Sequence, residues 1–139
     1  MAIKVKGITL CEWWTVDAQG RSSFISSFVN VGLQTVPGAI LSLVVAVELD
    51  GDEGETFSIA ITDPKRKVII ESGGSTIGVA DNIVSQHQLS TTMTVLRFGM
   101  LQFKMEGLHS VIVKSGNRVI ARRQFGVYLL PQGRNAANV

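Results

Sequence analysis

The sequence predicts an all-β fold, a single antiparallel β-sandwich of about eight strands. The clearest indication is the strict alternation of apolar residues in two neighbouring runs. Large aliphatic residues share one parity from Leu41 to Leu49, and apolar residues do so again from Phe57 to Ile61. The acidic loop Asp50–Glu55 separates the two runs. Period-two patterning broken by turn residues is typical of antiparallel strands with one buried face.

Further strands are predicted wherever β-branched and aromatic residues lie between turn signals. The turn signals are Asp17–Gly20, Asp63–Arg66 and Ser115–Asn117. The predicted strands are residues 3–16, 22–31, 41–49, 55–62, 67–72, 108–114 and 118–130, with a short strand near Thr76. The regular spacing of these short strands, without a convincing helix, favours an immunoglobulin-like arrangement.

Residues 81–103 are harder to interpret. Leu96, Met100 and Phe103 have helical spacing, whereas Val95, Leu101 and Phe103 share one strand parity. Gly99 and a run of threonines favour a strand for residues 90–103. The polar residues 81–88 give no clear secondary-structure signal, so their conformation stays open.

Length and composition predict one domain, residues 1–130, followed by a polar tail, residues 131–139. The 139-residue chain is 45% hydrophobic, which disfavours disorder, and only 17% charged. Because the average charged fraction is about a quarter, neutral or apolar groups must cover much of the surface. We therefore expect a homo-oligomer or a protein partner, with a Ser/Thr/Gly-rich monomer surface as the alternative.

Charge and cysteine content limit the classes of partner and compartment. The formal net charge of +2 is too small to indicate nucleic acid or an anionic membrane, so nucleic-acid binding is unlikely. The lone Cys11 excludes an internal disulfide and any multi-cysteine metal site, and it suits a reducing compartment. No signal peptide or membrane-length apolar run is visible. We expect a soluble cytoplasmic protein without membrane contact.

The motifs that could carry chemistry each lack an essential residue, so we expect no catalytic residue, metal site or cofactor, and not an enzyme. The loop Asp50–Glu55 fails the EF-hand spacing, although a weak cation site shared with another loop stays open. The glycine loop Gly73–Gly78 lacks the lysine of a phosphate-binding loop. A hydrolase acting through His87 or His109 would need a nearby nucleophile. For His109, a structural hydrogen bond at a sandwich corner is the favoured role.

Two sets of residues are candidates for binding. Trp13 and Trp14 are adjacent on a predicted strand, so one ring should face the core and the other outward. The outward ring could contact a ligand or a second subunit, or a loop of the same chain could cover it. Cys11 shares the parity of Trp13 and is expected to be a buried small hydrophobe. The second set is basic and would form a modest anion patch if its turns cluster, although a solvated turn and strand edge is the favoured interpretation. Its residues are Lys65, Arg66, Lys67, Arg122 and Arg123.

A non-catalytic protein-interaction or assembly module is therefore the expected function. The alternative is a small-ligand or anion-binding domain that uses loops at one end of the sandwich. The loops concerned are residues 50–55, 72–78 and 81–88.

The order of several short motifs resembles an uncharacterised family of small bacterial all-β proteins, a domain of unknown function. The resemblance spans residues 8–130. Its motifs are Cys11–Trp14, Asp17–Gly20, Val36–Pro37, Asp63–Lys65, Gly107–His109 and Gly116–Asn117. The chain departs from the family pattern at His109, where an aromatic such as tyrosine is expected, and at Lys65, where glycine is usual. The resemblance implies the fold and carries no activity with it.

Overall fold

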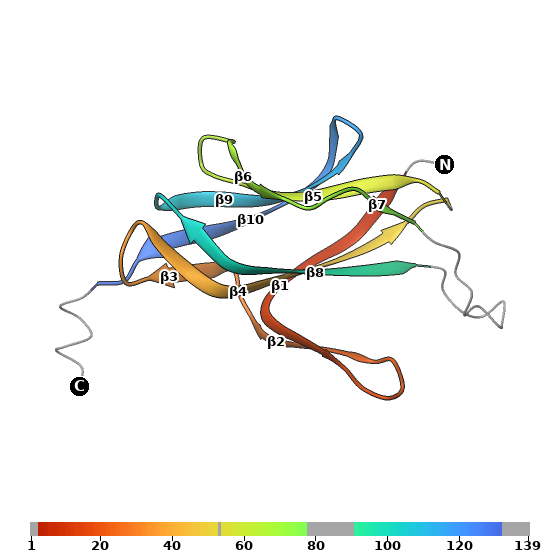
Figure 1. The fold of residues 1–139 in the computed structure, drawn as a ribbon, viewed down its shortest axis with the longest axis horizontal. Helices are drawn as coiled ribbons and strands as arrows, with labels where there is room; N and C mark the ends of the chain where they lie inside the picture. Colours follow the sequence, from red (N-terminus) through yellow and green to blue (C-terminus); the bar gives the residue numbers. More distant parts are fainter. Residues whose placement is uncertain (1–2, 53, 78–90, 132–139) are drawn as a thin grey trace.

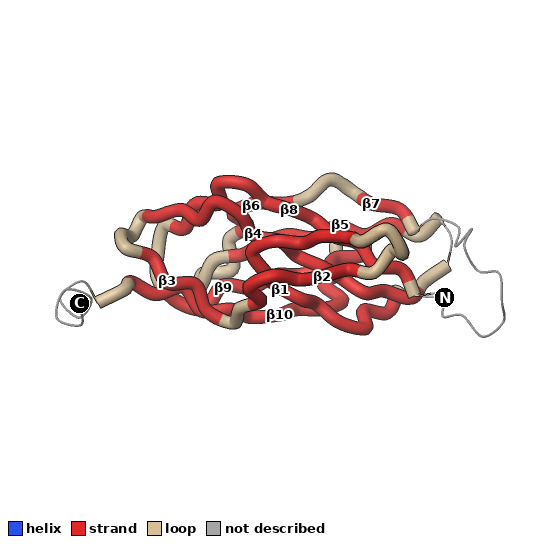
Figure 2. The backbone as a smooth tube through the Cα atoms, turned by 90° about the horizontal axis from the view of Figure 1, so that it is seen from below, coloured by secondary structure: helices blue, strands red, loops and turns tan. Residues whose placement is uncertain are grey.

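Ten strands form two packed layers in the computed structural model, which describes residues 3–52, 54–77 and 91–131 (Figure 1, Figure 2). One sheet has the strand order β2-β1-β4-β8, and the other has the order β3-β10-β9-β5-β6, with β7 paired to β5. The strands are β1 (Lys4–Val16), β2 (Ser22–Ser27), β3 (Asn30–Leu33), β4 (Gly38–Asp50), β5 (Thr56–Thr62), β6 (Val68–Glu71), β7 (Ser75–Thr76), β8 (Thr92–Phe103), β9 (Gly107–Ser115) and β10 (Arg118–Leu129).

The strand order is that of an immunoglobulin-like sandwich. The neighbours β1, β4 and β8 correspond to strands A, B and E, and the neighbours β10, β9, β5 and β6 correspond to G, F, C and C′. Strand β3 extends the second sheet by pairing in parallel with β10. The predicted fold class is therefore confirmed, as is the strand conformation of residues 92–103. The predicted tight hairpin at Gly116–Asn117 joins β9 to β10.

Strand β4 runs through the centre of the molecule. Its residues Leu43, Val45, Val47 and Leu49 have no exposed surface and belong to the core. Across the core, Phe57, Ile59 and Ile61 of β5 and Val111 and Val113 of β9 pack in the same cluster. Burial of each large aliphatic side chain stabilises the fold by about 1.5–3 kcal/mol. The alternating apolar residues of these strands therefore hold the two sheets packed face to face.

A cluster of rings fills one end of the core. Phe103 packs edge-on against His109, with ring centroids 5.1 Å apart, and against Phe125 at 6.0 Å. His109 is 1% exposed, and its Nδ1 donates a hydrogen bond to the Gly107 carbonyl at 3.1 Å. This bond ties the chain at the start of β9, as expected for His109, and the imidazole replaces the expected tyrosine as a ring packed in the core.

Two expectations about strands are wrong. Residues 22–31 do not form one strand, because the chain turns near Ser26, which has a φ of 57°, and passes from β2 in one sheet to β3 in the other. This split and the short β7 raise the number of strands among the described residues to ten. Leu41 is not in the core, since it is 76% exposed beside an irregular position of β8, where Met100 has a φ of 51°.

Replacing Phe103 with alanine should lower the free energy of unfolding by about 3–5 kcal/mol, because the cavity would open among His109 and Phe125. Urea denaturation followed by circular dichroism measures the change. The control is Leu108→Ala, which trims a side chain that is 59% exposed and should shift stability by less than about 0.5 kcal/mol. Equal effects of the two changes would contradict the described core.

Candidate functional site

Residues 12–27 form an arm that folds over the outer face of the first sheet. Strand β1 pairs with β4 only as far as Cys11, and its later residues pair with β2 alone. Figure 1 shows β2 below the layer of β1, β4 and β8, and Figure 2 shows β1 and β2 in front of it when seen from below. The Ser22 hydroxyl lies 4.0 Å from the Met93 sulfur of β8. The arm thus covers the sheet to which its own first half belongs.

The arm explains why β4 is buried on both faces. Val44 and Ala46 alternate with the core residues of β4 and so point outward, yet they are 2% and 3% exposed. Trp14 of the arm lines a cavity of about 280 Å³ together with Val44 and Val95. The indole therefore lies over apolar residues of the outer face.

A chain of polar contacts joins the arm to β4 and β8. The Arg97 Nε donates to the Ser42 hydroxyl at 3.1 Å, and this hydroxyl donates to the Glu12 carbonyl at 2.8 Å. The Arg97 guanidinium also lies 4.5 Å from the centre of the Trp13 ring. A cation over an indole face is attracted by the ring quadrupole, so Arg97 fixes both the backbone and a side chain of the arm.

The two tryptophans do not divide between core and surface as expected. Neither belongs to the core cluster, and both line the cavity beneath the arm. Because β1 leaves the sheet plane after Cys11, the alternation of side chains no longer points one ring between the sheets. Trp13 is 43% exposed. Trp14 is half-buried, and its buried Nε1 has no hydrogen-bond partner among the described residues.

Cys11, at the base of the arm, is fully buried, as predicted. Its Sγ donates to the Trp13 carbonyl at 3.2 Å. Burial raises the pKa of the Cys11 thiol, because the thiolate would be poorly solvated. The cysteine is therefore held as a neutral side chain.

The tip of the arm is the predicted turn at Asp17–Gly20. The Asp17 Oδ1 accepts hydrogen bonds from the backbone N–H groups of Arg21 and Gln19, each at 2.9 Å, and its Oδ2 accepts from the Arg21 Nε at 2.7 Å. The bonds from Arg21, followed by the bond from Gln19, hold the pKa of Asp17 below its ordinary value. The negative charge of Asp17 thus shapes the turn.

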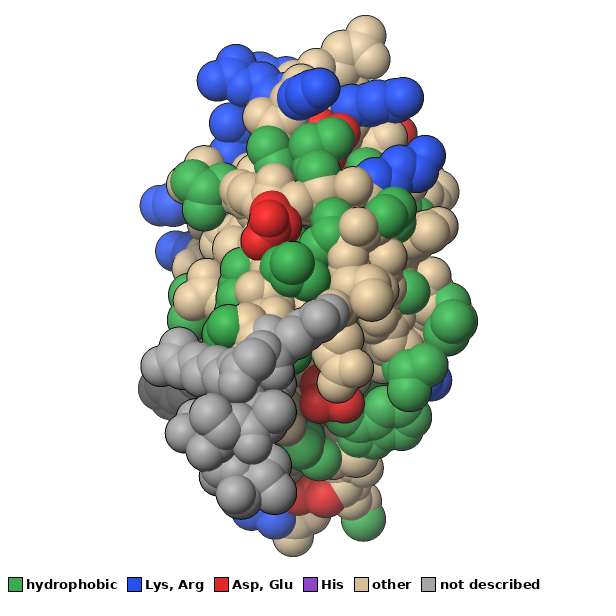
Figure 3. Space-filling model, turned by 90° about the vertical axis from the view of Figure 1, so that its left-hand side faces the viewer, with side chains coloured by type: hydrophobic (Ala, Val, Ile, Leu, Met, Phe, Trp, Pro, Cys, Tyr) green, Lys and Arg blue, Asp and Glu red, His purple; other side chains and the backbone are tan. Residues whose placement is uncertain are grey.

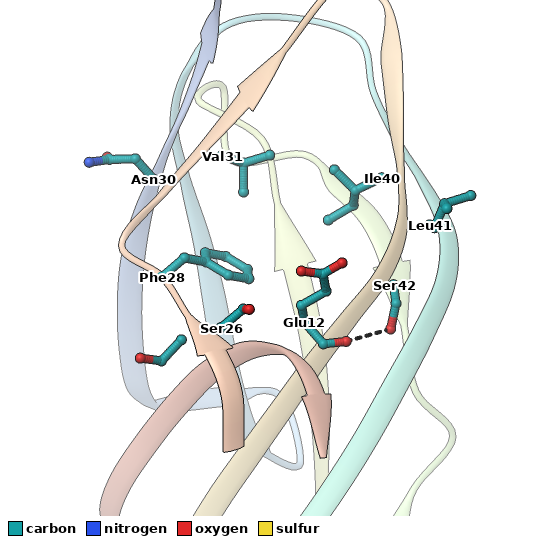
Figure 4. Close-up of a pocket in the computed structure, with 9 residues that line it drawn as sticks. Glu12, Ser26, Phe28, Asn30, Val31, Ile40, Leu41 and Ser42 are labelled. Carbon is teal, nitrogen blue, oxygen red and sulfur yellow. Dashed lines mark hydrogen bonds between the residues drawn. The ribbon is translucent and has the colours of Figure 1, made fainter. Parts of the chain in front are cut away.

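Figure 4 shows a cavity of about 410 Å³ at the base of the arm, where the chain passes between the two sheets. The Glu12 carboxylate points into it, towards Phe28, Val31 and Ile40. Among the described residues this carboxylate forms no ion pair. The cavity therefore places an acidic group beside apolar walls at the edge of the arm.

The exposed side of the arm continues onto β4. Trp13, Ile25 and Leu41 surround one concavity of about 410 Å³, which Glu12, Ser42 and Arg97 complete. We term these six residues the arm face. Ile25 is 48% exposed and is the strand partner of Trp13. Of these six residues, only Trp13 was predicted from the sequence as a candidate for binding. Arg97 could have been noticed because it is the one charged residue of β8.

A second concavity, of about 520 Å³, lies between the edge strands β6 and β8. Lys65 and Lys67 of the β5–β6 turn line it together with Lys104 of the β8–β9 turn. We term it the lysine pocket. The two turns are in contact, since a Cβ on Gly107 would lie 2.8 Å from the Pro64 Cγ. Figure 3 shows basic side chains gathered at the top of this end of the molecule. Lys104 was missed because only the fold brings its turn to Lys65.

The five predicted anion-patch residues do not form one patch. Lys65 and Lys67 line the lysine pocket, and Arg66 lies between them in the turn with a φ of 66°. Arg122 and Arg123 are on β10, which β9 and β5 separate from β6. The Arg123 Nη1 donates instead to the Ile8 carbonyl of β1.

The other sequence candidates show no catalytic arrangement within the described residues. His87 and the loop 81–88 lie outside those residues. For His109, the hydrogen bond found there is to the Gly107 carbonyl, with no serine or cysteine bonded to either nitrogen. No group of three metal-ligating side chains occurs in the part of the chain that the structure describes. The same part contains no helix long and apolar enough to span a membrane.

The acidic loop and the glycine loop lie side by side. The Gly54 N–H donates to the Ile77 carbonyl at 2.9 Å, and the Ile77 N–H donates to the backbone carbonyl of Glu55 at 2.8 Å. Within the acidic loop, the Glu55 carboxylate accepts from the Asp52 N–H, and Asp50 accepts from the Thr91 hydroxyl. The Thr91 bond, with a smaller contribution from Lys6, lowers the pKa of Asp50. The carboxylates of Asp50 and Glu55 therefore already bind protein donors.

The sequence signature of one protein family matches residues 6–128. The chain belongs to DUF6941, a family of unknown function. The resemblance to an uncharacterised family is thus confirmed for this DUF6941 protein. No curated protein matches its sequence.

Solved structures with similar folds include an immunoglobulin-like protein from Pseudomonas aeruginosa, at 11% identity and a TM-score of 0.48, covering 91% of this chain and 97% of that one. A β-glucosidase from Listeria innocua matches at 11% identity and a TM-score of 0.45. That match covers 91% of the DUF6941 chain and 16% of the glucosidase.

Replacing Ser42 with alanine should loosen the arm, because Arg97 and the Glu12 carbonyl both lose their hydrogen-bond partner. We expect a stability loss of about 1–3 kcal/mol and stronger quenching of tryptophan fluorescence by acrylamide. The control is Ser23→Ala on the exposed side of β2, which should change neither. Unchanged quenching in the Ser42 variant would contradict this attachment.

Acid should remove the contribution of Asp17 to the arm. Because the folded pKa is lowered, the carboxylate stabilises the fold above its unfolded pKa of about 3.9 and loses this effect as the pH falls through the folded value. The wild type should therefore exceed Asp17→Asn in stability at neutral pH, and the difference should shrink below about pH 4. Urea midpoints measured over a pH series test this, and a difference that stays constant into acid would refute it.

Proposed function

We propose that this DUF6941 protein is a non-catalytic interaction module that self-associates through the arm face. The observation that carries the proposal is the exposure of three large apolar side chains around one concavity. Trp13 is 43% exposed, Ile25 48% and Leu41 76%. Contiguous apolar surface of this kind is characteristic of interaction sites, and a central tryptophan and arginine are typical of their most important contacts.

The charges of the arm face favour a second copy of the same chain as the partner. Arg97 and Glu12 line the same concavity, which adjoins the cavity into which the Glu12 carboxylate points, because Glu12, Leu41 and Ser42 line both. Glu12 has no ion-pair partner among the described residues. In a twofold dimer the same patch meets itself. Arg97 of one protomer would then face the partner subunit's Glu12, and the reverse pair would form by symmetry. Because each arm face carries both charges, a twofold dimer would form two equivalent ion pairs.

We also propose that the module works in the bacterial cytoplasm. Support comes from the single cysteine, which is buried as a thiol, because a reducing compartment keeps such thiols unpaired. The low charged fraction of 17% supports burial of some surface against a partner.

Leu41→Glu should abolish self-association, because the substitution places a negative charge at the centre of the contact. It removes no core packing, since Leu41 is exposed. Sedimentation velocity from low micromolar to millimolar protein measures the oligomeric state. The wild type should change from monomer to dimer over this range, and the variant should stay monomeric.

The matched control is Leu108→Glu, since Leu108 is 59% exposed on the other sheet and should leave the dimer intact. A wild type that remains monomeric at millimolar concentration would overturn self-association. Equal loss of dimer in both variants would place the contact elsewhere.

A further inference from the structure

The lysine pocket combines features of a binding site that the proposed self-association does not use. It lies between the edges of the two sheets, with Ile69 and Ile70 on one wall and Leu101 and Met105 on the other. Leu101 is buried, and the other three side chains are half-buried. A volume of about 520 Å³ is in the range of small-molecule sites. The apolar part of a ligand could therefore leave water and pack against these walls.

Positive charge dominates the opening of the pocket. The ammonium groups of Lys65, Lys67 and Lys104 have no carboxylate partner within the described parts of the chain, where the ion pairs involve other residues. The acidic side chain of the lining is Asp63, whose Oδ1 accepts the backbone N–H groups of Lys65 and Lys67 at 2.8 and 2.9 Å. Three positive charges and one negative charge leave a formal +2 around the pocket.

His109 supplies a buried polar group to the same lining. It is 1% exposed, and the bond from its Nδ1 to the Gly107 carbonyl requires the proton on that nitrogen. Its Nε2 forms no hydrogen bond with a described residue. With the proton on Nδ1, this nitrogen can accept a hydrogen bond from a hydroxyl group of a ligand. The neighbouring Phe103 holds the ring in place at 5.1 Å.

We propose that the lysine pocket binds a small organic phosphate whose apolar body lies between β6 and β8. A phosphate monoester carries about −1.5 to −2 at neutral pH, which matches the charge of the pocket, whereas a carboxylate supplies only one negative charge. Lysine ammonium groups bind phosphate as point charges. The apolar walls select the ester over inorganic phosphate, and the lysines select it over the uncharged alcohol.

Calorimetric titration with four probes tests the ligand class: hexyl phosphate, inorganic phosphate, hexanoate and hexanol. Hexyl phosphate should bind most tightly at physiological salt. Inorganic phosphate binding as tightly as the ester would refute the apolar subsite. Hexanoate binding as tightly as the ester would refute the phosphate preference, and failure of all four to bind would overturn the proposal.

Variants test the location. Lys67→Ala and Lys104→Ala should each weaken hexyl phosphate binding by about tenfold, because each removes a charged contact. Lys4→Ala, on β1 outside the pocket, is the control with the same charge change and should bind like the wild type. Thermal melts verify that all variants fold. Unchanged binding in both pocket variants, or an equal loss in the control, would contradict the site.

The test is independent of the proposed self-association. Leu41→Glu should retain full binding of hexyl phosphate, because Leu41 does not line the lysine pocket. A monomeric variant that binds would leave this inference standing even if the dimer proposal failed. Loss of binding with Leu41→Glu would overturn the assignment of the ligand to the lysine pocket alone.

Discussion

The burial of β4 on both faces is the constraint on which the other features of this molecule depend. Its inner side chains, such as Val45, unite the two sheets, and its outer side chains, such as Val44, need a cover of their own. Antiparallel sandwich strands commonly leave the outer face to water. Here Val44 and Ala46 of β4 and Val95 of β8 occupy the outer face of the sheet, and the arm shields them from solvent.

Supplying the arm has structural consequences. Strand β1 must leave its partner after Cys11 and carry both tryptophans out of the sheet plane. The Trp14 Nε1 is buried without a described partner, at a cost of about 1–3 kcal/mol. The contacts of Arg97 and Ser42 offset this cost. The outside of the arm then becomes a new apolar surface, so covering one apolar face creates another beside Leu41.

The sequence reveals much of the scaffold because its signals are local. Alternation in residues 41–49, the turns at Asp17 and Asp63 and the hairpin at Gly116 each depend on a few neighbouring residues. The split of residues 22–31 could not be predicted in this way. Serine seldom adopts a positive φ, so the residue type at Ser26 gives no sign of the turn. Leu41 likewise lies opposite Met100, a residue far away in the sequence whose positive φ no local pattern indicates.

The candidate sites were less predictable than the fold for the same reason. Trp13 was identified because it is adjacent to Trp14 on a predicted strand, but its partners Ile25, Leu41 and Arg97 come from three other strands. Lys65 and Lys67 were identified as basic residues, whereas Lys104 joins them only because two turns meet at Pro64 and Gly107. Arg122 and Arg123 were misassigned because sequence does not reveal which strands lie between β10 and β6.

The arm lies over the outer face of β4 and β8, and the burial of both faces of β4 follows from this position. The most direct test is the pattern of nuclear Overhauser effects from the Trp14 indole in the isotope-labelled protein. We predict cross-peaks to the methyl groups of Val44 and Val95, which share its cavity, together with slow hydrogen exchange of its buried Nε1 proton. Cross-peaks to core residues such as Val45, or rapid exchange without contacts to β8, would contradict the account.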